Sequence, residues 1–220
     1  MAGRGAQSGG ERGTVDRILD TAEVLFAQKG FAETSLRAIT SKAGVNLAAV
    51  NYHFGSKEAL IQAVFERFLD PFCARLDSLL GELESKPGTV TLERLLATLS
   101  QSALAVQKGE PHRVAIFFRL SGLAYSQAQG HLRRFFREHY GEVFRRFLQQ
   151  LALAVPEVPP MEMFWRVHFA LGATIFTLSG MDPLRAICRS DFAVEVLPQQ
   201  VEERMLAFLA GGIRAPLPAS

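Results

Sequence analysis

Cysteine, tryptophan and tyrosine are scarce in this chain of 220 residues, which contains two, one and three of them respectively. Cys73 and Cys188 form neither a metal-binding pattern nor a disulfide framework, and this fits a reduced compartment. No apolar run reaches the roughly 18 residues that a membrane span needs, and residues 1–13 lack the apolar core of a secretion signal. We therefore expect a cytoplasmic protein without a membrane partner.

The motifs of the common enzyme classes are missing as well. The chain has no nucleotide-binding glycine loop, no His-Glu-x-x-His, no Cys-x-x-Cys and no nucleophile elbow. Its five histidines are scattered, and no alternation of apolar and polar residues is long enough for a strand. We expect an all-α fold of about nine helices, with no catalytic residues, no metal site and no cofactor.

Charge of one sign is not in large excess, since the formal net charge is +2 and the pI is near 8.7. This balance permits nucleic-acid binding without arguing for it, so any basic surface must be local. Apolar side chains, in contrast, are abundant: 48% of the residues are hydrophobic and 17 are phenylalanine. A small helical domain cannot bury so many rings, so the chain must hold a large core or a cavity lined by aromatic side chains.

Residues 33–60 predict two short helices joined by a tight turn, followed by the start of a long helix. Gly44 lies where a helix end favours a left-handed residue, and Asn46 is a good N-cap for the next helix. That second short helix buries Val50 and Phe54 but leaves small and polar side chains on its other face. Two helices joined by a glycine-containing turn, the second with such a face, are typical of a helix-turn-helix.

The second short helix is expected to enter a DNA major groove with its N-terminal residues foremost. Its alanines allow close approach, and Asn51 is its one side chain suited to bidentate recognition of adenine. Ser35 and Lys57 lie at helix N-termini, where free backbone N–H groups and the helix dipole favour a phosphate. Each residue alone is explained as a cap or a solvated side chain, but their joint spacing favours DNA. The candidate DNA-binding residues are Thr34, Ser35, Arg37, Leu47, Ala48, Ala49, Asn51, Tyr52, His53 and Lys57.

The remaining pattern is helical throughout. A first helix is predicted from residue 14 to residue 30, and a long one from residue 56 to about residue 84. Pro71 interrupts the long helix, so we expect a kink there, which either transmits motion between the two halves of the chain or merely fits the helix around its neighbours. Further helices are predicted at 91–107, 111–124, 127–154, 159–180 and 195–210, separated by turns at 86–88, 109–111, 127–130, 156–160 and 181–183.

The segment GVNLAAVNYHFGSKEAL, residues 44–60, resembles the signature of the TetR family of bacterial transcriptional regulators. The preceding ILDTAEVLFAQKGFAETSLRAITSKA resembles the first two helices of that family, so the resemblance covers residues 14–64. One position departs from the pattern: many members carry Tyr where this chain has Asn51. The preferred base sequence is therefore not transferred from the family.

The resemblance implies a two-domain, all-α homodimer that binds a palindromic DNA operator through its N-terminal domains and a small-molecule inducer through its larger domains. We accordingly expect a disordered arm at 1–13, a helix-turn-helix domain at 14–57, a ligand-binding and dimerisation domain at 58–212, and a frayed end at 213–220. The arm is either an inert tail or, through Arg4 and Arg12, a DNA contact.

Family dimers form a four-helix bundle from their last two helices, which here are 159–180 and 195–210. Ordinary core packing is the alternative role for the apolar faces of these two helices. The residues expected at the dimer interface are Phe164, Val167, Leu171, Ile175, Leu178, Val201, Met205, Phe208 and Leu209.

The larger domain is rich in aromatic side chains that could line an elongated apolar cavity. Arg119 lies in an apolar run, so a buried guanidinium there needs an anion, either a ligand carboxylate or an internal one such as Glu66 or Glu138. Two histidines lie in apolar helices, where a place in the core or in a pocket is favoured over catalysis. The candidate ligand-binding residues are Phe68, Phe72, Phe117, Arg119, Leu120, Phe136, His139, Tyr140, Phe144 and His168.

The whole chain, especially TSKAGVNLAAVNYHFGSKEALIQAVF followed by FLDPFC, also resembles the fatty-acid-responsive PsrA-like regulators within the family. This resemblance implies a long-chain fatty acid or acyl thioester as the effector, and we favour a repressor that such an effector releases from DNA. Two alternatives stay open. One is an activator, because the sign of regulation depends on where the operator lies; the other is a helical lipid carrier with a vestigial DNA-binding domain.

Overall fold

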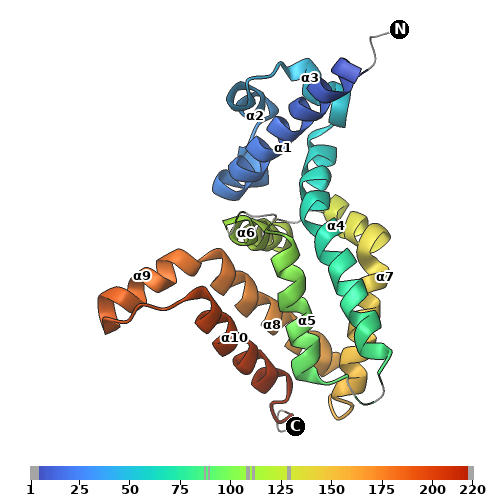
Figure 1. Ribbon diagram of the computed structural model, residues 1–220, viewed down its shortest axis with the longest axis vertical. Coiled ribbons are helices and arrows are strands. Elements are labelled where there is room, and N and C mark those ends of the chain that lie inside the picture. Colours follow the sequence, from blue (N-terminus) through green and yellow to red (C-terminus); the bar gives the residue numbers. More distant parts are fainter. Residues whose placement is uncertain are drawn as a thin grey trace.

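The computed structural model describes residues 5–86, 88, 90–107, 110, 112–127 and 130–217, and gives side chains from residue 13 onward. Within these ranges the chain forms ten α-helices and no β-strand, which confirms the predicted all-α fold (Figure 1). Predictions that involve Arg4, Pro87, Gly109, Pro111 or the side chain of Arg12 lie outside the described residues. The helices are α1 (Gly5–Glu33), α2 (Leu36–Ala43), α3 (Leu47–Phe54), α4 (Lys57–Glu84), α5 (Leu92–Ala105), α6 (His112–Ser126), α7 (Gly130–Ala154), α8 (Pro160–Ser179), α9 (Met181–Phe192) and α10 (Pro198–Ile213).

Helices α1–α3 form a small unit, here called the head, and α4–α10 form a larger one, here called the body (Figure 1). Ser35 and Asn46 cap α2 and α3, because their side-chain oxygens accept the backbone N–H three residues on at 3.1 and 2.8 Å. Gly44 ends α2 in the left-handed conformation, with φ 65° and ψ 39°. Gly30 breaks the helical path near the end of α1, with φ 85° and ψ 167°. The predicted turn at Gly44 and the predicted N-cap Asn46 are thus confirmed.

The two ends of the chain differ from expectation. Helix α1 begins at Gly5 rather than at the predicted Thr14, so residues 5–13 of the expected arm form its first turns; disorder of that arm stays a prediction. At the other end, residues 213–216, predicted to fray, are held by the body. Arg166 donates to the carbonyl oxygens of Ile213 at 2.7 Å and Pro216 at 3.4 Å.

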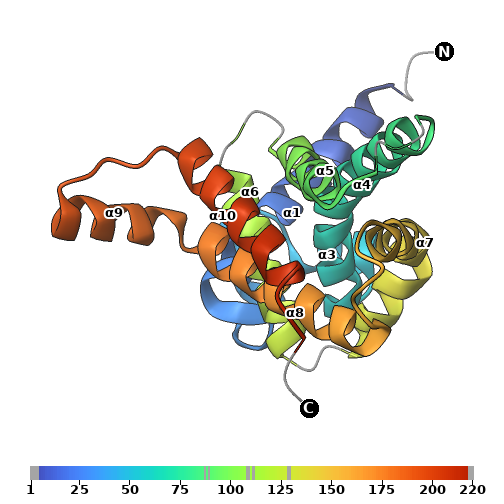
Figure 2. The same cartoon turned by 90° about the horizontal axis from the view of Figure 1, so that it is seen from below.

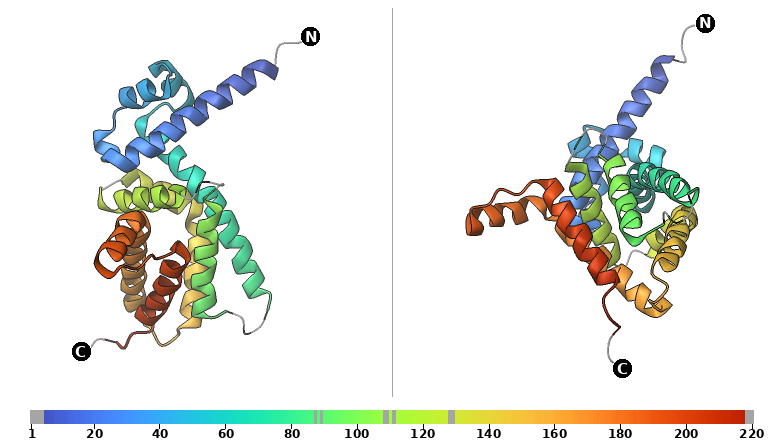
Figure 3. Two further views of the ribbon diagram at one scale, coloured as in Figure 1. Left: turned by 60° about the vertical axis from the view of Figure 1, so that its left-hand side comes forward. Right: turned by 60° about the horizontal axis from the view of Figure 1, so that its bottom comes forward.

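Helix α4 joins the head to the body and continues through Pro71, so the proline does not end it. In the body α4 packs against α5 and α7, α6 packs across α8, and α10 packs against both α8 and α5. The predicted turn at 181–183 is wrong, because α9 runs through it. Pro183 is the third residue of α9, and a residue in the first turn of a helix has no intrahelical N–H bond to lose. Figures 2 and 3 show α9 standing out from the rest of the body.

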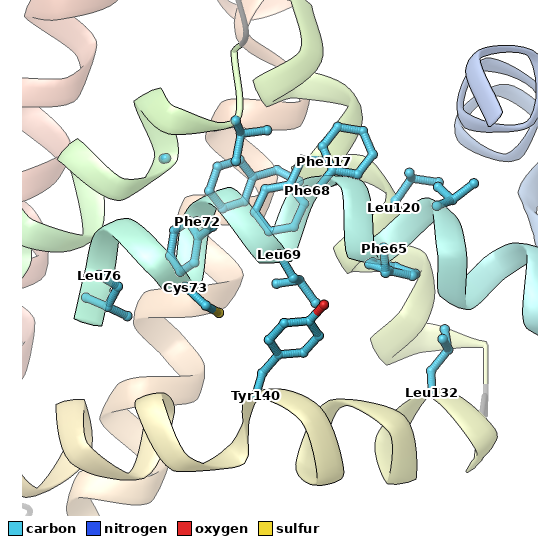
Figure 4. Packing of buried hydrophobic residues seen from close by; sticks show 14 of the residues in the cluster. Phe65, Phe68, Leu69, Phe72, Cys73, Leu76, Phe117, Leu120, Leu132 and Tyr140 are labelled. Atoms are coloured by element: carbon cyan, nitrogen blue, oxygen red, sulfur yellow. The ribbon is translucent and has the colours of Figure 1, made fainter. Parts of the chain in front are cut away.

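One continuous hydrophobic core runs from the head through α4 into the body. Its centre is a row of phenylalanine rings (Figure 4). The ring of Phe117 on α6 lies 5.6 Å from that of Phe68 and 6.0 Å from that of Phe72, and Phe72 in turn lies 6.3 Å from Phe144 on α7. Tyr140 of α7 donates its hydroxyl to Asp70 of α4 at 2.6 Å. Burial, followed by this hydrogen bond, raises the pKa of Tyr140. None of the helices described here is long and apolar enough to cross a bilayer.

The strained turn at the end of α1 gives a test of the head. Replacing Gly30 by Ala should lower the free energy of unfolding by about 1–3 kcal/mol, because non-glycine residues avoid this φ/ψ region. The added Cβ would also lie 2.9 Å from Nε2 of Gln127. Gly13→Ala is the matched control: Gly13 is exposed in α1 with no atom near its Cβ position, and alanine there should stabilise the helix by about 0.5–1 kcal/mol. Equal effects of both changes on urea unfolding would contradict the account.

Candidate DNA-binding interface and its link to the body

Helix α3 presents one buried and one exposed face. Val50 is fully buried against the rest of the head, whereas Leu47, Ala48, Asn51 and Tyr52 are exposed together on the opposite side. This exposed face has the small and polar character expected of a helix that lies in a major groove. Tyr52 is 77% exposed, so its hydroxyl is free to reach past the helix towards a phosphate.

Of the other predicted residues on α3, Ala49 and His53 are half-buried. Ala49 packs on the core, which leaves only part of its methyl group on the surface. The imidazole of His53 packs edge-on against Tyr52, with ring centroids 5.0 Å apart. Both residues therefore lie at the margin of the exposed face.

The predicted phosphate contacts divide into those that remain possible and one that does not. Ser35 and Arg37 are exposed at the start of α2, next to its free backbone N–H groups. Lys57 is half-buried at the start of α4 and donates to the carbonyl oxygen of Ala32 at 3.2 Å, which uses one of its three protons.

Thr34 is the exception. It is fully buried, and its hydroxyl donates to the carbonyl oxygens of Gly30 at 2.7 Å and Leu25 at 3.2 Å. The prediction that Thr34 binds a phosphate is therefore wrong for this geometry. Its hydroxyl instead satisfies carbonyl groups at the end of α1.

A buried cluster of charges joins the head to the body. Glu23 of α1 is 2% exposed and receives two hydrogen bonds from Arg113 of α6, at 3.0 and 3.3 Å. Arg67 of α4 lies 2.9 Å from Glu23 and 2.7 Å from the exposed Asp20. One carboxylate of the head is thus held by two arginines of the body.

Burial raises the pKa of the Glu23 carboxyl above its usual value, although both arginines oppose this shift. The guanidinium of Arg113 also lies over the ring of Phe68, 4.7 Å from its centroid, and its Nε has no hydrogen-bond partner among the described residues. Through Phe68 the cluster touches the row of rings in the body. A second contact between head and body lies nearby: the backbone N–H of Phe31 in α1 donates to the side chain of Gln127 at 3.3 Å.

The candidate ligand-binding residues occupy different environments. Arg119 is exposed rather than buried, so the premise that it needs an anionic partner is wrong. The buried arginine of α6 is Arg113, one turn before Phe117 on the same helix face. Of the others, Phe68, Phe72, Phe117, Leu120 and Tyr140 are buried, Phe136, Phe144 and His168 are half-buried, and His139 is exposed.

Two clefts lie around the junction of head and body. The first, of about 450 Å³, is lined by Asp20, Glu23, Val24, Arg67, Glu110, His112, Arg113 and Ile116. The second, of about 490 Å³, lies between α1, α3 and α4. Neither is lined by any candidate ligand-binding residue. In the part of the chain that is described, no three His, Cys, Asp or Glu side chains are grouped to hold a metal ion.

Comparison with known families decides the identity of this arrangement. The family of bacterial regulatory proteins named after tetR matches residues 18–64, and the tetracyclin repressor-like C-terminal domain matches residues 97–212. The chain belongs to the TetR family. Proteins of this family bind DNA and dimerise, and the first match covers α2, α3 and most of α1.

Individual relatives agree with this assignment. The chain is 32% identical to the HTH-type transcriptional repressor KstR2 of Rhodococcus jostii over 114 residues, which is 48% of this chain and 54% of KstR2. It is 41% identical to the HTH-type transcriptional regulator UidR of Escherichia coli over 51 residues, or 23% of this chain and 26% of UidR. The chain thus spans about half or less of the length of these relatives, which are transcriptional regulators rather than enzymes.

Among solved structures, a transcriptional regulator of the TerR/AcrR family from Aquifex aeolicus is similar to this chain with a TM-score of 0.51. The two are 23% identical, and the match covers 90% of this chain and 98% of that one. Such a likeness shows the fold alone.

The charge cluster at the junction gives the second test. Glu23→Leu alone should lower the free energy of unfolding by about 3–5 kcal/mol, because it leaves the Arg113 charge buried and unpaired. Arg113→Met alone should cost less, because Arg67 still lies 2.9 Å from Glu23. The double change should cost far less than the sum, since it removes both charges while Arg67 keeps Asp20. A double-mutant cycle by chemical denaturation measures this coupling. Additive losses would mean that the pair does not act as a unit.

Proposed function

We propose that this TetR-family protein is a ligand-responsive transcriptional repressor that binds a palindromic DNA operator as a homodimer. The observation that carries the proposal is the exposed face of α3, on which Leu47, Ala48, Asn51 and Tyr52 lie. Side chains of this kind read base edges and phosphates, and they bury little against the protein itself. Asn51 is the residue best suited to base recognition, because its amide can bond adenine at two points.

A large apolar surface on α8 and α10 supports the dimer. Met161, Trp165, Phe169 and Phe176 are half to three-quarters exposed and follow one another at helical spacing along α8, and Phe208 of α10 is exposed as well. Contiguous exposed apolar surface of this kind is uncommon on a monomer and marks an interaction site. Isologous pairing of such a surface across a two-fold axis matches a palindromic operator.

The residues expected at this interface differ in how far they are exposed on the single protomer. Val167, Ile175 and Leu178 are half-buried and pack partly on the core of their own protomer. Leu209 is buried, and Met205 is half-buried. Of the expected set, Phe164 and Phe208 are the exposed members, and Leu171 and Val201 are half-buried. The predicted helices thus supply the proposed interface, but mainly through other faces of α8 and α10.

The effector is proposed to be apolar, of the long-chain fatty acid or acyl thioester class that the resemblance to PsrA-like regulators implies. The row of rings on α4, α6 and α7 supports this class, because an acyl chain that parts the rings would meet apolar side chains on every side. Such parting would move Phe117, and with it the helix that carries Arg113. The ion pair to Glu23 would then pass the movement to the head and change the distance between the two α3 helices.

DNA binding is tested by removing exposed groups from α3. Tyr52→Ala and Asn51→Ala should each weaken retention of a DNA fragment from the protein's own promoter region by at least tenfold. Both residues are exposed, so the fold should be unaffected. Arg37→Ala should weaken retention as well and lower the salt dependence, by about one unit of slope per lost phosphate contact.

Lys29→Ala is the control, since it removes the same charge from an exposed position beside Gly30, at the end of the head that touches the body. Its affinity for the fragment should match that of the native protein. If all these variants bind alike, α3 is not the reading helix. A lipid-binding protein that retains no promoter DNA would instead favour the carrier alternative.

The effector class is tested by thermal and chemical unfolding with palmitate and with palmitoyl-CoA. Either should raise the free energy of unfolding by about 2.7 kcal/mol at a hundredfold excess over its Kd, and should release the operator fragment. Butyrate is the control, because its short chain cannot span the row of rings. Stabilisation by polar metabolites alone would overturn the fatty-acid class and leave the DNA-binding proposal intact.

A further inference from the structure

A cleft of about 450 Å³ lies at the junction of head and body, outside the row of rings, and is here called the junction cleft. Its volume is within the usual range for sites that bind small molecules. The residues that line it belong to α1 of the head, to α4 and α6 of the body, and to the segment just before α6. Figure 3 shows α6, drawn in yellow-green, crossing directly beneath the head. A molecule in this cleft would therefore contact both parts of the chain.

One buried hydrogen-bond donor in the wall of the cleft lacks an acceptor. The side chain of Arg113 is 7% exposed, and its Nε has no hydrogen-bond partner among the described residues. Its two terminal nitrogens are occupied, since both donate to Glu23, at 3.0 and 3.3 Å. A guanidinium carries five N–H donors in a rigid fork, so the edge that bears Nε can serve a second acceptor. A ligand oxygen there would remove the cost of a buried, unpaired N–H.

The rim of the cleft is acidic and open to solvent. The side chains of Asp20 and Glu110 are 62% and 60% exposed. Arg67 donates to Oδ1 of Asp20, which leaves Oδ2 able to accept another hydrogen bond. The carboxylate of Glu110 is approached by the imidazole of His112, at 3.5 Å. A cationic group at the rim would therefore have two carboxylates to pair with.

The charges of the cleft favour a ligand that carries both signs. Three carboxylates and two guanidinium groups line it, those of Asp20, Glu23, Glu110, Arg67 and Arg113. A plain anion would add to the excess of negative charge, and a plain amine would bring no acceptor to Arg113. A metal ion fits no better, because no three His, Cys, Asp or Glu side chains of the described residues are grouped to hold one. A carboxylate and an ammonium group on one small molecule meet both requirements.

The remaining part of the lining is apolar. Val24 of α1 and Ile116 of α6 are half-buried, and they contribute aliphatic surface from the two helices that meet at the junction. A short alkyl group packed on them would be removed from water. An acceptor for Arg113, a cation for the acidic rim and a short apolar side chain are together the groups of an apolar α-amino acid.

We propose that the junction cleft binds an apolar α-amino acid. Its carboxylate accepts from Nε of Arg113, and its ammonium group lies at the acidic rim. Its side chain packs on Val24 and Ile116. This site is separate from the proposed site for an acyl chain, so the inference goes beyond the proposed function and adds a second effector. Because the bound amino acid contacts α1 and α6 at once, it would hold the head on the body.

Binding is tested by isothermal titration calorimetry of the full-length native protein with leucine. Two half-probes that share its alkyl group isolate the charges: isocaproate lacks the ammonium group, and isoamylamine lacks the carboxylate. Each half-probe should bind about tenfold more weakly than leucine, or weaker still, which is the contribution of one hydrogen bond to a charged group. No binding up to the solubility limit of leucine, or equal binding of either half-probe, would overturn the inference.

Two substitutions at the rim test the position of the site. Asp20→Asn and Glu110→Gln should each weaken leucine binding about tenfold, because each removes a carboxylate from the ammonium group. Asp16→Asn is the matched control, since Asp16 is exposed one turn before Asp20 on α1 but does not line the cleft. Its affinity for leucine should equal that of the native protein. Native affinity in both rim variants would place the bound leucine elsewhere and contradict the inference.

The buried donor is tested by Arg113→Lys, which keeps a positive charge beside Glu23 but removes Nε. Leucine should then lose its advantage over isoamylamine, and a retained advantage would count against the proposed carboxylate contact. The outcomes are separable from those of the proposed function. A protein that retains its promoter fragment but binds no leucine defeats only this inference. A protein that binds leucine in the junction cleft but retains no promoter DNA defeats only the proposed function.

Discussion

A buried carboxylate of the head is held by two arginines of the body. Glu23 belongs to α1, yet the groups that neutralise it, Arg113 and Arg67, belong to α6 and α4. A carboxylate this deeply buried is costly unless paired, so any rotation that separates α1 from α6 would expose or strand a charge. This pairing holds α1 against both α6 and α4, so a movement of α6 would act on the position of the head.

The same arginine connects this constraint to the apolar centre of the body. Arg113 lies over Phe68, which stacks on Phe117, and Phe117 lies on α6 one turn after Arg113. A change in the packing of the rings would therefore move Arg113, both through α6 and through its cation–π contact with Phe68, and Arg113 is bonded to Glu23. In the proposed repressor these contacts link the effector site to the operator-binding helix. With the two protomers joined through α8 and α10, a tilt of each head would change the distance between the two α3 helices.

Much of the fold was readable from the sequence because its determinants are local. The cap at Asn46 and the glycine at 44 depend on a few neighbouring residues, so the turn between the two short helices could be predicted from the sequence. Contacts between distant segments could not. The sequence singles out Arg119 because it interrupts an apolar run, but the buried face of α6 follows residues 113, 117 and 120, a spacing of one helical turn. The partner of Arg113 had one signal in the sequence. Glu23 lies between the apolar residues Ala22, which is buried, and Val24, which is half-buried. Thr34 was misassigned for a related reason: a hydroxyl before a helix suits both a phosphate and a carbonyl, and only the fold decides.

The most direct test of this coupling is the operator affinity of the protein that carries Glu23→Leu together with Arg113→Met. In this variant the apolar replacements keep the junction packed while the charge pair that sets the angle of the head is gone. The account predicts that operator affinity falls at least tenfold, about 1.4 kcal/mol, although the protein remains folded and dimeric. An affinity equal to that of the native protein would contradict the claim that the buried pair positions the head.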